Sequence, residues 1–253
     1  MDDSVSSSDV ATHLVCAATD SGFIRQSVTV RDARSLIERP SLEREGFRLV
    51  THATRVTNFF DPAEVRSVCY PEIEYILREA TGATRAVAFE HDVRCASTAE
   101  RRARGVREPV RVVHNDYTAK SSPERARLYL GGDEAEELLR GHYALINVWR
   151  PIVGPVLDTP LGVCDAQSMA ETDLLPTEQG VKHEVYMIKF SAGHRWYYFP
   201  AMTTEEALLL KCFDSRPGNH ARFTAHSAFD LPCTAPEAAA RQSIEVRALV
   251  FFS

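Results

Sequence analysis

Hydrophobic positions recur at helical spacing in one early part of the chain. Asp61 can cap a helix there, and Pro62 suits its first turn. An apolar stripe follows and stops at Gly82; it consists of Ile73, Ile76, Leu77 and Ala80. The pattern predicts a helical region over 61–82 that Pro71 breaks or restarts.

Elsewhere most hydrophobic residues fall in short runs rich in β-branched and aromatic side chains, which is typical of strands. The predicted strands cover one or two segments within 46–60, then 85–91, 110–118, 143–152, 161–169, 183–191, 194–201, 223–229 and 241–252. The run 206–215 fits a helix or a strand, and we favour a strand. A second helix is expected from Ser122 to about Arg140, across two glycines.

Many short strands at close spacing, with helices mostly in the first half, predict a mainly β fold with flanking helices. An antiparallel sandwich or barrel of the jelly-roll type fits this order. Residues 92–109 are dense in charge and show little periodicity. We interpret them as a surface loop, with a mobile lid over a site as the alternative.

The overall charge and the cysteines narrow the class of protein. A formal net charge of -6 argues against nucleic acid as the main partner. No apolar run is long enough to span a bilayer, and the acidic, Ser-rich start lacks the features of a signal peptide. None of the six cysteines forms a C-x-x-C pair. These features predict a cytoplasmic protein that acts without nucleic acid or membrane, either alone or as a homodimer.

One pair of polar residues lies at the end of a predicted strand. His114 and Asp116 share one face of the run "VRVVHNDYT", because side chains alternate along a strand. Among the nine histidines, only His114 has a carboxylate two residues later. A capped strand end explains the pair structurally, and two ligands of a metal site explain it chemically.

Two imidazoles and one carboxylate on one face of an iron(II) ion define a large class of oxygenases. The third ligand would come from a distant strand, and the candidates are His142, His183, His194, His220 and His226. His226 stands in "FTAHSAF", a short apolar stretch near the end of the chain, which suits a buried ligand.

The last predicted strand carries charged residues on one face. Alternation puts Arg241, Ser243, Glu245 and Arg247 on the same side. An arginine grips a carboxylate with two parallel hydrogen bonds, and a hydroxyl two residues on can share it. The face therefore suits the far carboxylate of a 2-oxo dicarboxylate such as 2-oxoglutarate.

Several longer strings resemble a known family. They are "GFRLVTHATRVTNFFD", "EIEYILREATGATRAVAFEHDVR", "VHNDYT", "LINVWRPIVGPVLDTPLGVCDAQSM", "WYYFPAMTTEEALLLKCFDS", "AHSAF" and "RQSIEVRALVFF". Together they resemble the CmcJ/NvfI/AsaB-like family of oxidative tailoring enzymes of bacterial and fungal secondary metabolism. The resemblance runs from about Gly46 to Phe252. It suggests a division into 1–45, a tail with leading strands, and 46–253, a double-stranded β-helix domain of the jelly-roll or cupin type with helical insertions.

The resemblance also implies a non-haem iron(II), 2-oxoglutarate-dependent oxygenase that uses dioxygen on a small-molecule substrate. Carried over by motif, the metal ligands fall on His114, Asp116 and His226. The arginine that binds the co-substrate falls on Arg241, with Ser243 beside it, and Arg247 on the same face is the alternative.

Four further residues have both a structural and a functional interpretation. Arg150, in "NVWRPI", either binds a backbone carbonyl or holds a substrate or co-substrate anion. Asn147 either points toward the site or satisfies a backbone group, and Trp149 either packs or contacts substrate. Tyr117, just after the ligand pair, could line the mouth of the site.

The sequence argues against two other classes of protein and leaves two rival functions open. It contains no G-x-S-x-G, no P-loop and no G-x-G-x-x-G motif, so hydrolase and nucleotide-binding chemistry are not indicated. Two rivals to the oxygenase stay open: a cupin-like metalloenzyme that works without 2-oxoglutarate, and a non-catalytic partner subunit or small-molecule binding module.

Overall fold

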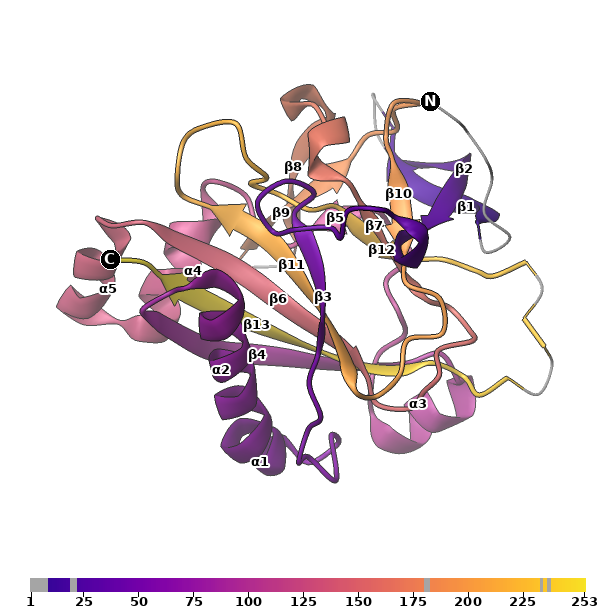
Figure 1. The fold of residues 1–253 in the computed structure, drawn as a ribbon, viewed down its shortest axis with the longest axis horizontal. Helices are drawn as coiled ribbons and strands as arrows, with labels where there is room; N and C mark the ends of the chain where they lie inside the picture. Colours follow the sequence, from indigo (N-terminus) through magenta and orange to yellow (C-terminus); the bar gives the residue numbers. More distant parts are fainter. Residues whose placement is uncertain (1–8, 19–21, 180–182, 233, 236–237) are drawn as a thin grey trace.

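Two β-sheets face each other in the computed structural model, which describes residues 9–18, 22–179, 183–232, 234–235 and 238–253 (Figure 1). The larger sheet has the strand order β1-β2-β10-β7-β12-β5-β9-β8. Its strands are β1 (Val10–Ala17), β2 (Phe23–Asp32), β5 (His114–Asn115), β7 (Leu161–Cys164), β8 (Leu174–Gln179), β9 (His183–Ile188), β10 (Trp196–Tyr198) and β12 (His226–Ala228). The smaller sheet, in the order β3-β11-β6-β13-β4, consists of β3 (Phe47–Thr51), β4 (Arg85–Cys95), β6 (Tyr143–Pro151), β11 (Glu206–Asp214) and β13 (Gln242–Phe251).

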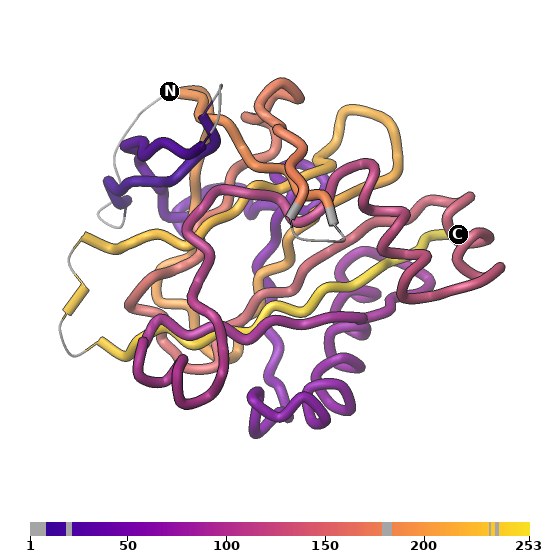
Figure 2. Tube along the Cα trace, turned by 180° about the vertical axis from the view of Figure 1, so that it is seen from behind, coloured from indigo at the N-terminus to yellow at the C-terminus, as the bar shows by residue number. Residues whose placement is uncertain are grey.

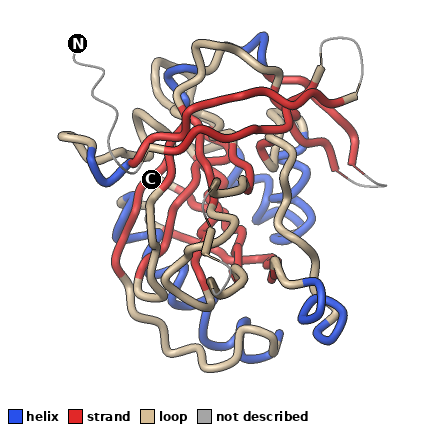
Figure 3. The backbone as a smooth tube through the Cα atoms, turned by 90° about the vertical axis from the view of Figure 1, so that its right-hand side faces the viewer, coloured by secondary structure: helices blue, strands red, loops and turns tan. Residues whose placement is uncertain are grey.

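Helices lie at the periphery of the strands, as Figure 3 shows in a side view. They are α1 (Pro62–Glu64), a π-helical turn (Val65–Cys69), α2 (Tyr70–Thr81), α3 (Thr98–Arg104), α4 (Ser121–Leu130) and α5 (Gly132–Leu139). Short 3-10 turns cover Ala33–Ser35, Ala166–Ser168 and Glu171–Asp173.

The larger sheet curls until its first strand nearly meets the strand that carries His114. Val15 of β1 forms a parallel bridge with Val112, and its carbonyl accepts a hydrogen bond from the Val113 amide at 2.8 Å. This curled sheet opposite a flatter one confirms the expected mainly β, jelly-roll or cupin-like fold. The division of the chain at residue 46 stays a prediction.

The smaller sheet has one face toward the helices and one toward the larger sheet. Ile73 and Leu77 of α2 pack on the outer face, against even-numbered residues of β6 and β13 such as Ile146 and Val246. Odd-numbered residues of β6, such as Leu145, face the larger sheet. Figure 2 shows from behind how β13, in yellow, runs beside β4 to the end of the chain.

The predicted helix over 61–82 forms as expected. Asp61 caps it by accepting a hydrogen bond from the Ala63 amide, and Gly82 ends it in the left-handed conformation with φ 71°. The backbone stays helical from α1 through the π-helical turn into α2, so Pro71, in the first turn of α2, neither breaks nor restarts the helix.

The expectation of a surface loop over 92–109 is wrong. Strand β4 continues to Cys95, and α3 follows, capped by the Ser97 hydroxyl, which accepts a hydrogen bond from the Glu100 amide. The helix has no buried residue and therefore no apolar stripe, which is why periodicity did not reveal it. The available signal was Ser97 followed three residues later by Glu100, a pattern that is typical of the start of a helix.

Several boundaries also differ from the predictions. The expected strands 161–169 and 194–201 shorten to β7 and β10, and β8 was not expected. The helix expected from Ser122 to Arg140 breaks into α4 and α5 at Gly131, whose φ is 72°. The favoured strand over 206–215 is confirmed as β11.

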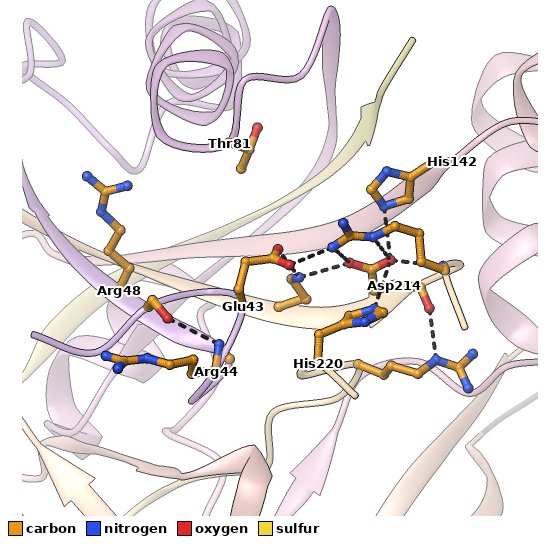
Figure 4. Close-up of polar contacts among 12 residues, drawn as sticks. Glu43, Arg44, Arg48, Thr81, His142, Asp214 and His220 are labelled. Atoms are coloured by element: carbon orange, nitrogen blue, oxygen red, sulfur yellow. Dashed lines mark hydrogen bonds and ion pairs between the residues drawn. The ribbon is translucent and has the colours of Figure 1, made fainter. Parts of the chain in front are cut away.

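A buried ion-pair network ties the end of β11 to its neighbours, as Figure 4 shows. The Lys211 ammonium lies 2.8 Å from Asp214 and 2.7 Å from Glu43. Arg216 binds the same two carboxylates, and the His142 ring lies 3.0 Å from Asp214. Burial raises the pKa of Asp214, but the bonds from Lys211 and Arg216 outweigh it and hold this pKa well below its usual range.

Replacing Asp214→Asn should lower the free energy of unfolding by about 3–5 kcal/mol at pH 7, because it removes the buried one of the two carboxylates that neutralise the Lys211 ammonium. A carboxylate whose folded pKa is lowered stabilises the fold above its unfolded pKa of about 4, and this contribution is lost as the pH falls further. Urea unfolding measures the free energy of unfolding of the parent and the variant at pH 7 and at pH 3. Glu38→Gln, at an exposed ion pair, is the control; an equal loss for Asp214→Asn at both pH values would contradict the prediction.

Candidate metal centre

Two histidines face each other across neighbouring strands. His226 of β12 is the direct antiparallel partner of His114 of β5, and their ring centroids lie 4.5 Å apart. Each ring is held by the carbonyl two residues before it: Nδ1 of His114 lies 2.8 Å from the Val112 oxygen, and Nδ1 of His226 lies 3.1 Å from the Thr224 oxygen. A carbonyl only accepts, so each Nδ1 carries a proton, and each Nε2 is the ring nitrogen that can bind a metal ion.

Asp116 completes the group at the end of β5. Its Oδ1 lies 3.4 Å from His114 Nε2, and one ligand atom from each of Asp116, His114 and His226 lies within 4.8 Å of the others. Within the described ranges this is the group of histidine, cysteine and carboxylate side chains arranged to hold a metal ion.

Burial and neighbouring charges set the protonation of these groups. Burial and the nearby His114 lower the pKa of His226 to about 4, so its imidazole is neutral at pH 7. Burial raises the pKa of Asp116, but Arg247 and His114 outweigh it and hold this pKa well below the usual range. Burial lowers the pKa of His114, but the Asp116 carboxylate beside its Nε2 outweighs it and raises the pKa, so a metal ion bound there would replace the Nε2 proton. A neutral imidazole and a charged carboxylate are the forms that bind a divalent cation.

Asn115, between the two residues of the H-x-D pair, joins both ligand segments. Its Nδ2 donates to the carbonyls of Tyr117 and Cys212 at 2.6 and 2.9 Å, and its Oδ1 accepts from the Thr224 amide at 3.3 Å. The side chain is fully buried. The sequence analysis missed this role, although a polar residue on the core-facing side of a strand was a usable signal.

A cavity of about 530 Å³ opens over these ligands between the two sheets. One part of its wall is apolar and comes mostly from the larger sheet and the segment before β5: Phe23, Val110, Val112, Leu161, Val185 and Met187. The opposite part is charged and comes from β4, from β13 and from the residue just before β13: Glu90, Asp92, Arg94, Arg241, Glu245 and Arg247. The space therefore suits a largely apolar molecule with a polar side.

Arg241 is a buried cation with no carboxylate partner among the described residues. Its side chain lines the cavity, and the residue is 4 % exposed. It donates to the Ser243 hydroxyl at 3.0 Å and to the Thr159 carbonyl at 2.8 Å, and its guanidinium lies 5.0 Å from the Trp149 ring centroid. No carboxylate of the described residues forms an ion pair with it, and burial lowers its pKa to about 9. An anion in the cavity would supply the missing charge.

Arg247, in contrast, already contacts several carboxylates. Its Nε donates to Asp116 at 2.9 Å, and its Nη1 donates to Asp92 at 3.0 Å. Glu245 and Glu90 lie within ion-pair distance at 3.3 and 3.9 Å. Carboxylates of the protein therefore already neutralise the Arg247 guanidinium, so Arg247 is less suited than Arg241 to bind a ligand anion.

The three residues expected to contact substrate divide into one that lines the cavity and two that do not. Trp149 lines it. Tyr117 is 1 % exposed and packs in the core between the sheets. Asn147 is fully buried, and its Nδ2 donates to Asp116 at 2.7 Å, so it contacts an expected metal ligand instead.

Arg150 does not reach the cavity, and its expected binding of a co-substrate or substrate anion is corrected. Its Nη2 donates to the carbonyls of His52 and Thr204, and the guanidinium lies 6.0 Å from the Phe59 ring centroid. The reason is alternation along β6: Trp149 faces the larger sheet, so the next residue faces the helices. The structural interpretation of Arg150 is the one that fits.

The other candidate histidines lie elsewhere. His142 and His220 lie beside Asp214, at 3.0 and 3.5 Å, and His194 lies 3.0 Å from Asp173. The side chain of His183 lies outside the described part of the structure. Of the candidates whose side chains are described, His226 is the one that meets His114 and Asp116.

Two facing sheets that enclose two imidazoles and one carboxylate define the class of cupin-type folds with a non-haem metal site. A family model described as "Oxidoreductase/YMDC permease-like domain" matches residues 8–251. The chain belongs to this family. No helix within the described ranges is both long and apolar enough to cross a membrane.

Named relatives and a solved structure agree with this assignment. The chain is 33% identical over 260 residues to the hydroxylase/desaturase CTB9 of Cercospora beticola, covering 91% of this chain and 79% of that protein. It is 32% identical over 235 residues to the Fe(II)/2-oxoglutarate-dependent dioxygenase nvfI of Aspergillus novofumigatus, covering 88% and 82%. The structure of the iron and alpha-ketoglutarate-dependent endoperoxidase NvfI superposes with a TM-score of 0.84 at 27% identity, covering 97% of each chain. The expected resemblance to the CmcJ/NvfI/AsaB-like family is confirmed.

A divalent metal should stabilise the metal-free protein, because it binds a site that exists only in the folded state. At a metal concentration about a hundred times Kd, we expect the free energy of unfolding to rise by about 2.7 kcal/mol. This raises the melting temperature by about 5–10 °C for a chain of this size. Anaerobic thermal melts with and without Co(II) measure the shift.

His226→Ala and Asp116→Asn should abolish this shift. His194→Ala, at a histidine paired with Asp173, should keep it and serves as the control. A full shift in His226→Ala would show that the ion binds at another place.

Proposed function

We propose that this chain is an Fe(II)- and 2-oxoglutarate-dependent oxygenase that oxidises a small-molecule intermediate of secondary metabolism. The observation that carries the proposal is the buried group of His114, Asp116 and His226. Arg241 lines the same cavity and is a buried cation that has no carboxylate partner in the described part of the chain. Both the metal and the anionic co-substrate of this class would find a complementary partner there. The names of the relatives support the same activity.

The donor set fits iron(II). Each histidine offers an Nε2 lone pair because a backbone carbonyl holds the opposite ring nitrogen, and Asp116 offers a charged oxygen. Three protein ligands leave positions open for other molecules. When bound, iron(II) together with 2-oxoglutarate and dioxygen supplies the oxidising chemistry at a C–H bond.

Arg241 and Ser243 would bind the far carboxylate of 2-oxoglutarate. Their side chains already contact each other, the guanidinium is held by the Thr159 carbonyl, and the Trp149 ring lies beside it. An arginine fixed in this way binds a carboxylate with little further loss of side-chain freedom. This arrangement favours Arg241 over Arg247 for the co-substrate.

The remaining cavity wall would orient the substrate. Apolar residues such as Val112, Leu161 and Met187 exclude water and bind an apolar skeleton. Hydroxylation, desaturation, cyclisation or endoperoxide formation are the outcomes that such a site supports, and the choice depends on which C–H bond lies nearest the metal position.

The two rival functions receive less support. A metalloenzyme that works without 2-oxoglutarate leaves the charge of Arg241 without an explanation. A non-catalytic partner does not need two imidazoles and a carboxylate arranged for a metal ion. We further propose a cytoplasmic location, because Cys16, Cys69, Cys95, Cys164 and Cys212 are free thiols.

Anaerobic titration of the protein with Fe(II) and then 2-oxoglutarate should produce the weak visible charge-transfer band of the chelated 2-oxo acid. Absorbance spectroscopy measures it. A folded protein that binds Fe(II) but shows no band at saturating 2-oxoglutarate would contradict the proposal and would support the metalloenzyme that works without 2-oxoglutarate.

Arg241→Met should raise the KM for 2-oxoglutarate at least about 30-fold, which corresponds to the loss of about 2 kcal/mol from a buried charge pair. Steady-state succinate formation measures it. Arg150→Met is a matched control, since Arg150 is equally buried but lies on the helix side of β6. Similar KM values for Arg241→Met and the parent would exclude this residue as the co-substrate partner.

A further inference from the structure

The two oxygens of Asp116 have different surroundings. Oδ1 faces the histidines and lies 3.4 Å from His114 Nε2. Oδ2 accepts two hydrogen bonds from the smaller sheet, from Asn147 Nδ2 at 2.7 Å and from Arg247 Nε at 2.9 Å. Asp116 is 6 % exposed, so these contacts replace water on that side.

Asn147 and Arg247 form one unit on the smaller sheet. They are direct cross-strand partners of β6 and β13, and both side chains point toward the larger sheet. Directly paired residues in an antiparallel sheet have neighbouring side chains, so both donors reach the same oxygen from adjacent strands. We call these two residues the Asp116 clamp.

We propose that Asn147 and Arg247 are positioning residues that hold Asp116 by Oδ2, so that it binds the metal through Oδ1 alone. The inference rests on the proposed function, because it needs a metal at this site. A carboxylate can ligate with one oxygen or with both, and a second bound oxygen would take a position that the co-substrate or dioxygen needs.

Asn147 is a polar side chain in an apolar core position, which a purely structural role does not explain. It is fully buried between apolar residues of β6, and its Oδ1 has no hydrogen-bond partner among the described residues. An ionised carboxylate only accepts, so the amide NH₂ must face Asp116. A leucine would fill such a core position without leaving a buried oxygen unpaired, so the contact with Asp116 is what the asparagine adds.

Arg247 is aimed by its other contacts. Asp92 accepts from Nη1 at 3.0 Å, and Glu245 lies 3.3 Å from Nη2. Because the guanidinium is planar and rigid, fixing both Nη atoms fixes the direction of Nε, which points at Asp116. Asp92 is itself bound by Arg94 and Arg107, so the wall of the cavity keeps the clamp in place.

The test uses Co(II) bound to the full-length, metal-free protein, because the visible absorption of Co(II) reports the number and type of its ligands. The variants are Asn147→Leu, which removes one donor without a charge, Arg247→Met, and Arg247→Lys. The control is Arg216→Met, which also removes an arginine from a buried aspartate, Asp214, at a remote cluster (Figure 4).

We expect Asn147→Leu and Arg247→Met to weaken Co(II) binding 10–100-fold and to change the intensity of the Co(II) bands, as loss of support for a metal ligand does. Arg247→Lys should restore part of the affinity. Arg216→Met should lower the melting temperature and leave the Kd and the spectrum as in the parent. If Arg247→Met does not fold, Asn147→Leu alone decides, because it changes no charge.

Two results would overturn the inference alone: Asn147→Leu with the Kd and spectrum of the parent, or Arg216→Met with the same loss as the clamp variants. A parent protein that binds no Co(II) would overturn the proposed function and this inference together. The two failures are therefore distinguishable in one experiment.

Discussion

The antiparallel pairing of His114 with His226 is the constraint on which the site depends. Because side chains alternate along a strand, a shift of one residue in this register would turn one ring to the other face of the sheet. Strand β5 is only two residues long, so ladder bonds alone cannot fix it. Asn115 and the bond from the Val113 amide to Val15 supply what the short strand lacks. Buried polar side chains are thus used here to secure register.

The smaller sheet adds a second constraint through strand β13. Its even-numbered residues, such as Ile244 and Val246, pack under α2, while Arg241, Ser243, Glu245 and Arg247 face the cavity. One strand therefore provides apolar packing on one face and charge on the other. Arg247 and Glu245 form ion pairs inside the protein, whereas Arg241 forms none with a carboxylate of the described residues. A fold tolerates a buried cation of this kind most readily where a ligand later neutralises it.

Much of the fold and the core of the site could be predicted from sequence, because both follow from periodicity. Alternation put His114 with Asp116 and ordered the charged residues of β13, and the helix over 61–82 carried its own cap and stop. Contacts between distant segments could not be predicted in this way. Asn115 reaches Thr224, and Asn147 reaches Asp116, through tertiary packing that no local pattern encodes. At Arg150 the sequence left a structural and a functional interpretation open, and the position of the residue on the outward face of β6 favours the structural one.

Two clusters in this chain, one around Asp116 and one around Asp214, contain the same types of residue, but within the ranges that the structure describes a lysine is present only in the second. Asp116 lies with two histidines and Arg247, and Asp214 lies with two histidines and Arg216. At Asp214 the chain supplies its own cation, because the Lys211 ammonium lies 2.8 Å from the carboxylate. At Asp116 both imidazoles turn Nε2 inward, and no lysine is among the described residues that line the cavity. The Asp214 cluster is therefore completed by a lysine of the chain, whereas at the Asp116 cluster one ligand atom from each of the aspartate and the two histidines lies within 4.8 Å of the others, as a metal ion requires.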